Sequence, residues 1–195
     1  KLGTLCIIDT KPRKLTEDDL IALKDLAELT ERELAAIQIA TLDELTGITN
    51  RRGFMILAQS SLNMCHRLRI PASLVFLDLN KFKSINDNFG HAEGDQVLKV
   101  FAHTMTKFFR DSDVFARLGG DEFVVLMTNT EKEKALEIIS RFRISIDKIN
   151  QVNPLDYTIS FSEGIIDIEI GKEHDIDKLL SAADNLMYEQ KKKQV

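Results

Sequence analysis

Two adjacent acidic residues, Asp121 and Glu122, follow a pair of glycines within residues 117–126, between two short apolar segments. A Gly-Gly pair in this position predicts a two-residue β-hairpin turn. The turn itself requires no acids, and neighbouring carboxylates at the edge of a sheet repel each other. We therefore expect a cation to offset the charge of this turn.

A third carboxylate, Asp78, lies at the C-terminal end of residues 73–79, an apolar run that predicts a central strand. Three carboxylates at one end of a sheet, without His or Cys, form a hard oxygen site that suits Mg²⁺ or Mn²⁺ rather than Zn²⁺. Because magnesium fills its remaining coordination with water and phosphate, a nucleoside triphosphate is the natural ligand. Gly119 and Gly120 lack a Cβ and allow a nucleotide close to the backbone.

Groups that can hold phosphate flank these acids. The connection at residues 80–83 is expected to present backbone N–H groups to phosphate oxygens, and Lys83 and the region of Lys191 add positive charge. For Lys191 a solvated helix end is the alternative interpretation, because a cation there interacts favourably with the helix dipole.

Composition limits the other possibilities. The chain has 195 residues, a net charge of −5 and 44% hydrophobic residues, which fits one globular domain with an appendage. Mild acidity argues against nucleic acid as the main partner. No apolar run approaches the roughly 18 residues that cross a bilayer, so we expect a soluble, cytoplasmic fragment without membrane contact. Cys6 and Cys65 are predicted to be reduced core residues.

After residue 50 the hydrophobic pattern predicts helix, strand, helix, hairpin, helix, strand and helix. This order is typical of an α+β sandwich with a mainly antiparallel sheet and helices packed on it. Asn50 should cap the first helix, with a buried stripe of Phe54, Leu57, Ala58, Ser61, Cys65 and Leu68. Residues 80–88 are interpreted as a polar connection, and the remaining elements are expected at residues 97–108, 114–118, 123–127, 131–149, 157–166 and 176–191.

A long helix is expected before this region, with Thr16 as its cap and Asp19 placed to answer it. Apolar or small residues recur at spacings of three and four, which makes a heptad seam of Leu20, Leu23, Ala27, Thr30, Leu34, Ile37 and Thr41. The seam has two interpretations: a dimer stem, or an amphipathic helix that lies on its own domain.

Five sequence blocks resemble the GGDEF-domain diguanylate cyclases. The signature Gly119-Gly-Asp-Glu-Phe123 is intact and follows Ala116-Arg-Leu, and the other blocks are residues 43–52, 76–87, 90–95 and 183–188. The resemblance covers about residues 41–193. It implies a palm-like nucleotide-cyclase sandwich that joins two GTP molecules into cyclic di-GMP and releases pyrophosphate by two-metal phosphoryl transfer.

The resemblance also implies roles for individual residues. Asp78 and Asp121, helped by the Leu79 carbonyl, correspond to ligands of two Mg²⁺ or Mn²⁺ ions. Glu122 corresponds to a further metal or transition-state carboxylate, or to the base for the attacking 3′-hydroxyl. Substrate contacts are implied for Gly119, Gly120, Phe82, Lys83 and Lys191, with Asn86 and Asp95 as the pair that reads guanine.

Arg110 and Asp113 match the family's Arg-x-x-Asp inhibitory site, which binds the product away from the catalytic centre. The planar guanidinium of Arg suits this role because it binds phosphate bidentately and stacks on a base. The alternative is an ordinary helix-terminal Arg beside a turn Asp. Because each domain of the family holds one GTP, the resemblance also implies a homodimer in catalysis.

The first residues resemble the tail of a GAF sensor domain. We therefore expect three parts: residues 1–15 as the last strand and turn of a sensor domain, 16–42 as a signalling helix and 43–195 as the cyclase domain of a longer, sensor-controlled protein. Departures from the family pattern are Asn80 in place of the more usual Asp, Gln190 in place of a small residue, and no Gly-Arg-Asn after Lys191.

Two other functions fit parts of this pattern. A non-enzymatic receptor for GTP or cyclic di-GMP usually shows decay of the acidic motif, which is intact here. A structural dimerisation module with incidental acids would not need the two guanine-reading residues.

Overall fold

The computed structural model describes residues 6, 8, 10–12, 14–152, 156–169, 171–172 and 174–193. The chain divides into two compact units, Lys1–Ala40 and Thr41–Val195. Of residues 1–15, the expected last strand and turn of a sensor domain, eight lie outside the described residues. Cys6 is exposed, so its predicted burial is wrong, because a short segment cannot cover a side chain by itself.

Helix α1 (Glu17–Thr41) begins at the predicted cap. The Asp19 carboxylate accepts a 2.8 Å hydrogen bond from the Thr16 N–H, and the Thr16 hydroxyl accepts a 3.2 Å bond from the Asp19 N–H. The reciprocal pair satisfies N–H groups that the first turn leaves without helical partners. Along the predicted seam, Leu20, Leu34 and Ile37 are exposed. No helix among the described residues has the length and apolarity required to span a bilayer.

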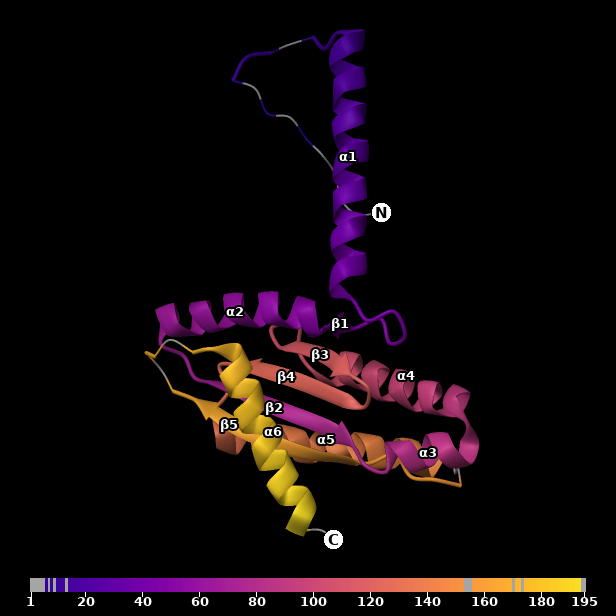
Figure 1. Ribbon diagram of the computed structural model, residues 1–195. Helices are drawn as coiled ribbons and strands as arrows, with labels where there is room; N and C mark the ends of the chain where they lie inside the picture. Colours follow the sequence, from indigo (N-terminus) through magenta and orange to yellow (C-terminus); the bar gives the residue numbers. More distant parts are fainter. Residues whose placement is uncertain are drawn as a thin grey trace. The chain divides into compact units, whose positions relative to one another are not determined.

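The second unit is built on one five-stranded sheet (Figure 1). Its strands are β1 (Thr49–Asn50), β2 (Ala72–Leu79), β3 (Val114–Gly119), β4 (Glu122–Thr128) and β5 (Phe161–Ile168), in the order β1-β3-β4-β2-β5. Only β1 and β3 pair in parallel, and all other pairs are antiparallel. The expected mainly antiparallel sheet is confirmed.

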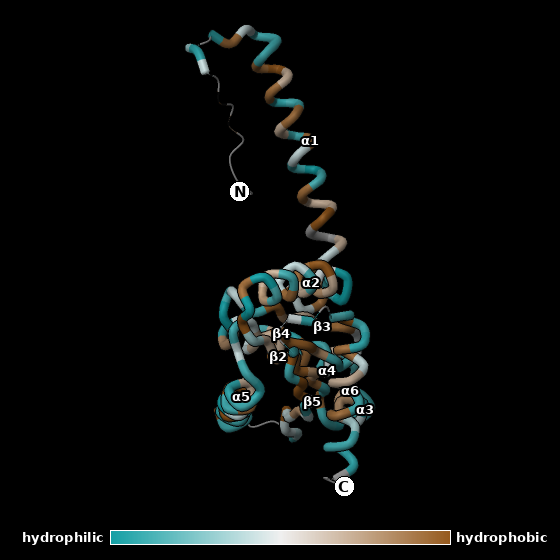
Figure 2. Tube along the Cα trace, turned by 90° about the vertical axis from the view of Figure 1, so that its left-hand side faces the viewer, coloured by the Kyte–Doolittle hydropathy of each residue, from teal (hydrophilic) through white to brown (hydrophobic). Residues whose placement is uncertain are grey.

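Helices cover both faces of the sheet. Helices α2 (Arg51–Leu68) and α6 (Ile176–Lys193) pack on one face, whereas α4 (His91–Phe108) and α5 (Lys132–Val152) pack on the other. Strand β2 supplies side chains to both layers, because Phe76 faces the first and Val75 and Leu77 face the second. Figure 2 shows the hydrophobic segments gathered along the strands between the helices. The predicted α+β sandwich is therefore confirmed.

Three features of the helices and strands differ from the sequence prediction. Residues 80–88, interpreted as a polar connection, contain the short helix α3 (Phe82–Phe89). Its apolar residues Phe82, Ile85 and Phe89 do recur at helical spacing, but the helix has only eight residues, and Ile85 is its one buried side chain among the described residues. The short strand β1 was not predicted, and β5 begins four residues later than expected, after the polar residues before Phe161.

The buried stripe of α2 is also partly different. Phe54, Ala58 and Cys65 are buried as predicted, but Leu57 and Leu68 are exposed and Leu62 takes the core position. The face of the helix that meets the sheet is followed by residues 54, 58 and 62, which are four positions apart. Residues 57 and 68 lie to the side of that face. Asn50 caps α2 as predicted, and its side chain accepts a 2.9 Å hydrogen bond from the Gly53 N–H.

Helix α6 lies directly on β5 at Gly164. A Cβ at this position would stand 1.9 Å from the Ala183 carbonyl oxygen and 2.6 Å from the Met187 nitrogen. Both are backbone atoms of α6, so they cannot move aside as the tip of a flexible side chain can. The absence of a side chain at residue 164 therefore sets how closely this helix approaches the sheet.

We predict that Gly164→Ala lowers the free energy of unfolding by about 2 kcal/mol, because α6 must move away from the sheet. Urea denaturation measures the change. Asp167→Ala, at an exposed position of the same strand, is the matched control and should have a much smaller effect. Equal stability of Gly164→Ala and the wild type would contradict the close approach.

Candidate active site

The β2–β4 register places two of the predicted catalytic acids opposite each other. Asp78 pairs with Glu122 at the end of the ladder. The adjacent Leu79 N–H donates a 3.1 Å hydrogen bond to the Asp121 carbonyl oxygen, which closes the hairpin against β2. Backbone pairing therefore brings Asp78, Asp121 and Glu122, 43 and 44 residues apart in sequence, to one edge of the sheet.

The Gly-Gly turn has the conformation that glycine favours. Gly120 has φ +52°, in the left-handed region. A Cβ built at either Gly119 or Gly120 would meet no described atom within 4 Å. The space above the turn is therefore open, as close approach of a nucleotide requires.

Arg117 and Asp43 stabilise this turn through side-chain hydrogen bonds. The Arg117 Nε donates a 2.9 Å hydrogen bond to the Gly120 carbonyl oxygen, and its Nη1 contacts both Asp43 carboxylate oxygens at 3.1 and 3.2 Å. Thr46 donates to the same carboxylate through its N–H and its hydroxyl. Burial opposes ionisation of Asp43, but the bonds from Thr46 and Arg117 outweigh it and lower the pKa of this carboxyl.

The acids of the hairpin edge repel one another. Burial is the largest cause that raises the pKa of Asp78, and the charges of Asp121 and Asp184 add to it. Burial also raises the pKa of Glu122, followed by the charges of Asp184 and Asp78. Four carboxylates thus affect one another across this edge, which identifies it as a place where positive charge is favourable.

A lysine supplies part of that charge. The Lys191 ammonium on α6 donates to the Asp78 Oδ1 at 2.5 Å, and the two side chains are 32% and 16% exposed. This pairing opposes the rise in the pKa of Asp78. The contact brings Lys191 to the acidic edge with a carboxylate as its partner, and its predicted contact with substrate stays a prediction.

The donor set at this edge suits a hard divalent cation. Its side chains offer carboxylate oxygens without nitrogen or sulfur ligands, which is the set that Mg²⁺ prefers. Within the described ranges, no three His, Cys, Asp or Glu side chains are already gathered as a metal cluster. Asp78, Asp121 and Glu122 are therefore neighbours whose carboxylates must converge further to ligate one ion.

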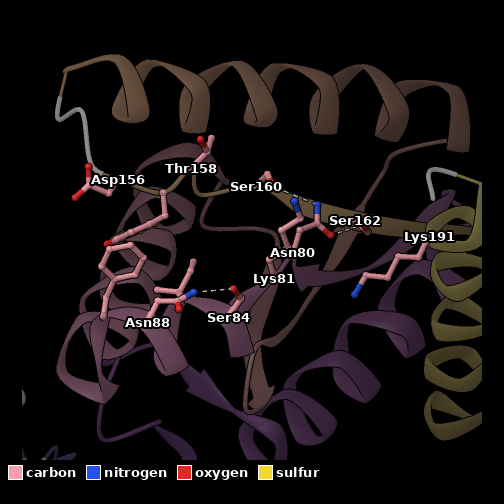
Figure 3. A pocket seen from close by; sticks show the side chains of 12 residues that line it. Asn80, Lys81, Ser84, Asn88, Asp156, Thr158, Ser160, Ser162 and Lys191 are labelled. Carbon is pink, nitrogen blue, oxygen red and sulfur yellow. Dashed lines mark hydrogen bonds between the residues drawn. The ribbon is translucent and has the colours of Figure 1, made fainter.

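Asn80, a departure from the family pattern, links β2 to β5. Its Nδ2 donates to the Ser160 hydroxyl at 3.2 Å, and its Oδ1 accepts a 2.7 Å bond from the Ser162 hydroxyl (Figure 3). The amide therefore uses a donor and an acceptor together, which a carboxylate cannot do. Beside it lies a pocket of about 700 Å³, which Lys81 and Lys191 also line.

Helix α3 begins immediately after this turn. Lys81 precedes it with φ +56°, and Phe82 and Lys83 form its first turn. The predicted phosphate-binding connection is therefore a helix N-terminus, whose first N–H groups lack intrahelical partners and favour an anion. Phe82 is partly buried against the core, whereas Lys83 is exposed.

The two predicted guanine-reading residues lie on neighbouring helices, Asn86 on α3 and Asp95 in the first turns of α4. The helices meet closely at Gly94, where a Cβ would stand 1.9 Å from the Asn86 Oδ1. The structure thus brings Asn86 next to the residue that precedes Asp95.

Arg110 and Asp113 share one turn between α4 and β3. The Asp113 carboxylate accepts a 3.2 Å hydrogen bond from the Arg110 N–H, and the Asp113 N–H donates to the Arg110 carbonyl oxygen at 2.9 Å. Burial raises the pKa of Asp113, while Arg110 opposes the rise. The turn precedes β3 and the Gly-Gly turn follows it, so the two lie about 17 Å apart along the strand.

The sheet, the acidic hairpin and the helices on both faces define the palm-like fold of nucleotide cyclases. The chain belongs to the GGDEF family of diguanylate cyclases: the family model "Diguanylate cyclase, GGDEF domain" matches residues 40–195. Two curated relatives from Escherichia coli K12 are the probable diguanylate cyclase DgcC, 30% identical, and the diguanylate cyclase DgcM, 32% identical. Each alignment covers 88% of this chain but only 46% and 41% of the relative, so the chain spans less than half of either.

Solved structures show the same fold. The coiled coil and GGDEF domain of DgcB from Caulobacter crescentus, in complex with c-di-GMP, has a TM-score of 0.78 at 22% identity over 89% of this chain and 92% of that one. The active GGEEF domain of a diguanylate cyclase from Vibrio cholerae has a TM-score of 0.66 at 29% identity over 74% and 91%.

Sequence reasoning missed three charged residues of the site. Asp184 contributes to the raised pKa of both Asp78 and Glu122, and Arg51 partly opposes it at Glu122. Asp184 precedes Lys191 by seven residues, two helical turns, so the assignment of Lys191 would have indicated the same face of α6. Asp43 was noted only as part of a motif, and nothing local indicated its pairing with Arg117, 74 residues away.

We predict that Asp43→Asn lowers the free energy of unfolding by about 2 kcal/mol near pH 7, because Arg117 then lacks its counter-charge. The pKa of Asp43 is lower in the folded state, so the ionised carboxylate stabilises the fold above about pH 4 and this contribution disappears as pH falls through the folded pKa. Urea denaturation between pH 3 and 7 should show the difference between wild type and variant shrinking at low pH.

Asp177→Asn is the control, because its ion pair with Arg51 is 64% and 60% exposed and should contribute little. A stability difference for Asp43→Asn that stays constant down to pH 3 would argue against an ionised brace.

Proposed function

We propose that this domain condenses two GTP molecules into cyclic di-GMP and releases two pyrophosphates. The observation that carries the proposal is the β2–β4 register, which sets Asp78 opposite Glu122 beside an intact Gly-Gly-Asp-Glu turn. Relatives named as diguanylate cyclases and neighbours solved with c-di-GMP support the same conclusion.

In this proposal Asp78, Asp121 and the Leu79 carbonyl hold two Mg²⁺ or Mn²⁺ ions, with Glu122 as a further carboxylate. Bound there, the ions would lower the pKa of the 3′-hydroxyl and offset charge on the phosphates. The chain's own groups bind and orient the substrate. Backbone N–H groups in the first turn of α3 and the Lys191 ammonium donate hydrogen bonds to phosphate oxygens. The nucleotide packs against the open Gly-Gly turn.

Guanine recognition is assigned to Asn86 and Asp95. A carboxylate can accept hydrogen bonds from the N1–H and N2–H edge of guanine, which adenine does not offer. A site with such polar groups rejects an unsuitable base because the groups are then left unpaired.

The reaction requires two domains, because each supplies one GTP and the two triphosphates react with each other. We propose a homodimer, supported by the apolar seam of α1, on which Leu20 and Ile37 are 54% and 55% exposed. The sensor-domain origin of the first residues and the division at residues 1–15, 16–42 and 43–195 belong to the same proposal.

Arg110 and Asp113 are proposed to bind the product and inhibit the reaction. Their shared turn lies at the other end of β3 from the Gly-Gly turn, so product held there leaves the catalytic edge free. The Arg110 side chain is exposed and available to a phosphate, and the Asp113 carboxylate is fixed by the turn.

We predict that the domain, incubated with GTP and Mg²⁺, forms cyclic di-GMP that chromatography detects. Asp121→Asn should reduce the rate about 100-fold or more, because it removes a charged ligand from the reacting phosphates. Asp147→Asn, which removes the same charge from the exposed side of α5, is the matched control. GTP binding without turnover would favour a receptor, and failure to bind GTP would refute the nucleotide site.

We predict that Arg110→Ala makes the enzyme less sensitive to its product. In assays with increasing cyclic di-GMP, the concentration that halves the rate should rise about tenfold or more, because a charge-assisted contact to phosphate is lost. Lys107→Ala, which removes a cation from the last turn of α4, is the control. Identical inhibition curves for the wild type and Arg110→Ala would exclude Arg110 from product binding.

A further inference from the structure

Helices α3 and α4, which carry Asn86 and Asp95, receive support from a distant part of the chain. Tyr157 lies in the segment before β5 and contacts both helices. Its hydroxyl donates a 2.5 Å hydrogen bond to the Glu93 Oε1, in the first turn of α4. Its ring lies 5.1 Å from the ring of Phe89, the last residue of α3. One side chain therefore joins the end of one helix to the start of the next.

Both contacts lie close to the guanine-reading residues. Glu93 is two residues before Asp95, and Phe89 is three residues, almost one helical turn, after Asn86. Tyr157 itself is not one of the predicted substrate contacts. Its contacts with Glu93 and Phe89 give it control over the positions of α4 and α3.

The two helices have little tolerance for relative movement. The Asn86 Oδ1 would lie 1.9 Å from a Cβ at Gly94, and the Phe82 ring would lie 3.3 Å from it. The Asn86 amide therefore rests almost on the α4 backbone, and a small displacement of α4 changes its position relative to Asp95. Recognition by several hydrogen bonds is sensitive to displacements of this size.

Tyr157 and Phe89 also line the open pocket of about 700 Å³ that borders α3 (Figure 3). Ser84 and Asn88 of α3 line this pocket and share a 3.1 Å hydrogen bond within their own helix. Tyr157 thus lies in the wall of this pocket, and its hydroxyl extends from there to Glu93 on α4. Burial, followed by Glu93, raises the pKa of Tyr157, so its hydroxyl remains a donor at neutral pH.

We propose that Tyr157 is a positioning residue that sets the selectivity of the α3–α4 pair for guanine. The proposal rests on the cyclase function, in which Asn86 and Asp95 read the base. The hydroxyl holds α4 through Glu93 while the ring holds α3 through Phe89, so the distance between the two reading groups is fixed. Guanine donates hydrogen bonds through both its N1–H and its N2–H groups. Its binding therefore depends on this distance more than the binding of hypoxanthine, which lacks the N2 amino group.

The test measures binding of a non-hydrolysable GTP analogue and of the matching inosine analogue, with Mg²⁺, by isothermal titration calorimetry. Tyr157→Phe keeps the ring and removes the hydrogen bond. We expect this variant to bind the GTP analogue about fivefold more weakly than the wild type does. The affinity for the inosine analogue should fall clearly less, so that the preference for guanine decreases. Glu93→Ala should have the same effect, and the double variant should be no weaker than either single one. Glu93→Gln retains an acceptor oxygen and should stay close to wild type.

Tyr188→Phe is the matched control, because it makes the same change at the chain's other tyrosine. That ring is exposed on α6 beside the Lys192 ammonium at 4.3 Å, a contact that phenylalanine keeps. Thermal denaturation of each variant verifies that it is folded at the temperature of the titration. The control should leave both affinities unchanged.

The outcomes separate this proposal from the cyclase function. A wild type that prefers the GTP analogue, together with a Tyr157→Phe variant of unchanged preference, would overturn the positioning role alone. Equal weakening of both analogues would also overturn it, since a general structural role predicts no change in selectivity. A wild type that binds neither analogue would overturn both proposals.

Discussion

Strand β2 hydrogen-bonds to β4 on one edge and to β5 on the other, and this double pairing determines where Asp78, Asp121 and Glu122 lie. Side chains alternate between the two faces of a strand, so a slip of one residue would move the Asp78 carboxylate into the buried position of Leu77 or Leu79. That slip is excluded because residues 74–77 and Leu79 are all nearly or fully buried, and an ionised carboxylate at one of these positions would be costly. Hydrophobic packing thus fixes the position of a carboxylate that contributes nothing to the core.

The sequence predicted the parts of this arrangement that depend on local patterns. The apolar run before Asp78 indicated a central strand, the Gly-Gly pair indicated the hairpin, and Asn50 indicated the start of α2. Helix α3 was not predicted, because five of its eight residues are polar or charged and its stability comes from packing of Ile85 and Phe82 against the core. The start of β5 was misplaced because its pairing partner, β2, lies some 80 residues earlier.

Contacts between distant residues were beyond local pattern analysis for a physical reason. The Arg117–Asp43 brace and the Tyr157–Glu93 bond join residues 74 and 64 positions apart. Such pairs form only after the sheet and helices have assembled, and many other charged or aromatic residues are equally plausible partners in the unfolded chain. Both pairs hold elements that carry the predicted site, the hairpin turn in one case and α3 with α4 in the other. The residues that could contact substrate were therefore easier to name than those that keep them in place.

The ammonium of Lys191 on Asp78 has a consequence for how the proposed metal ions would bind. The Lys191 ammonium is a counter-ion that belongs to the folded chain itself. The acidic edge therefore behaves as an ion exchanger, in which an entering cation replaces one that is already bound. A divalent ion that engages the same oxygen of Asp78 must displace an amine that cannot diffuse away, because it is tethered to the last turns of α6. The displaced amine stays within reach of whatever anion accompanies the metal. Under the proposed function, exchange of one positive charge for another would turn Lys191 from a partner of the protein into a partner of the ligand.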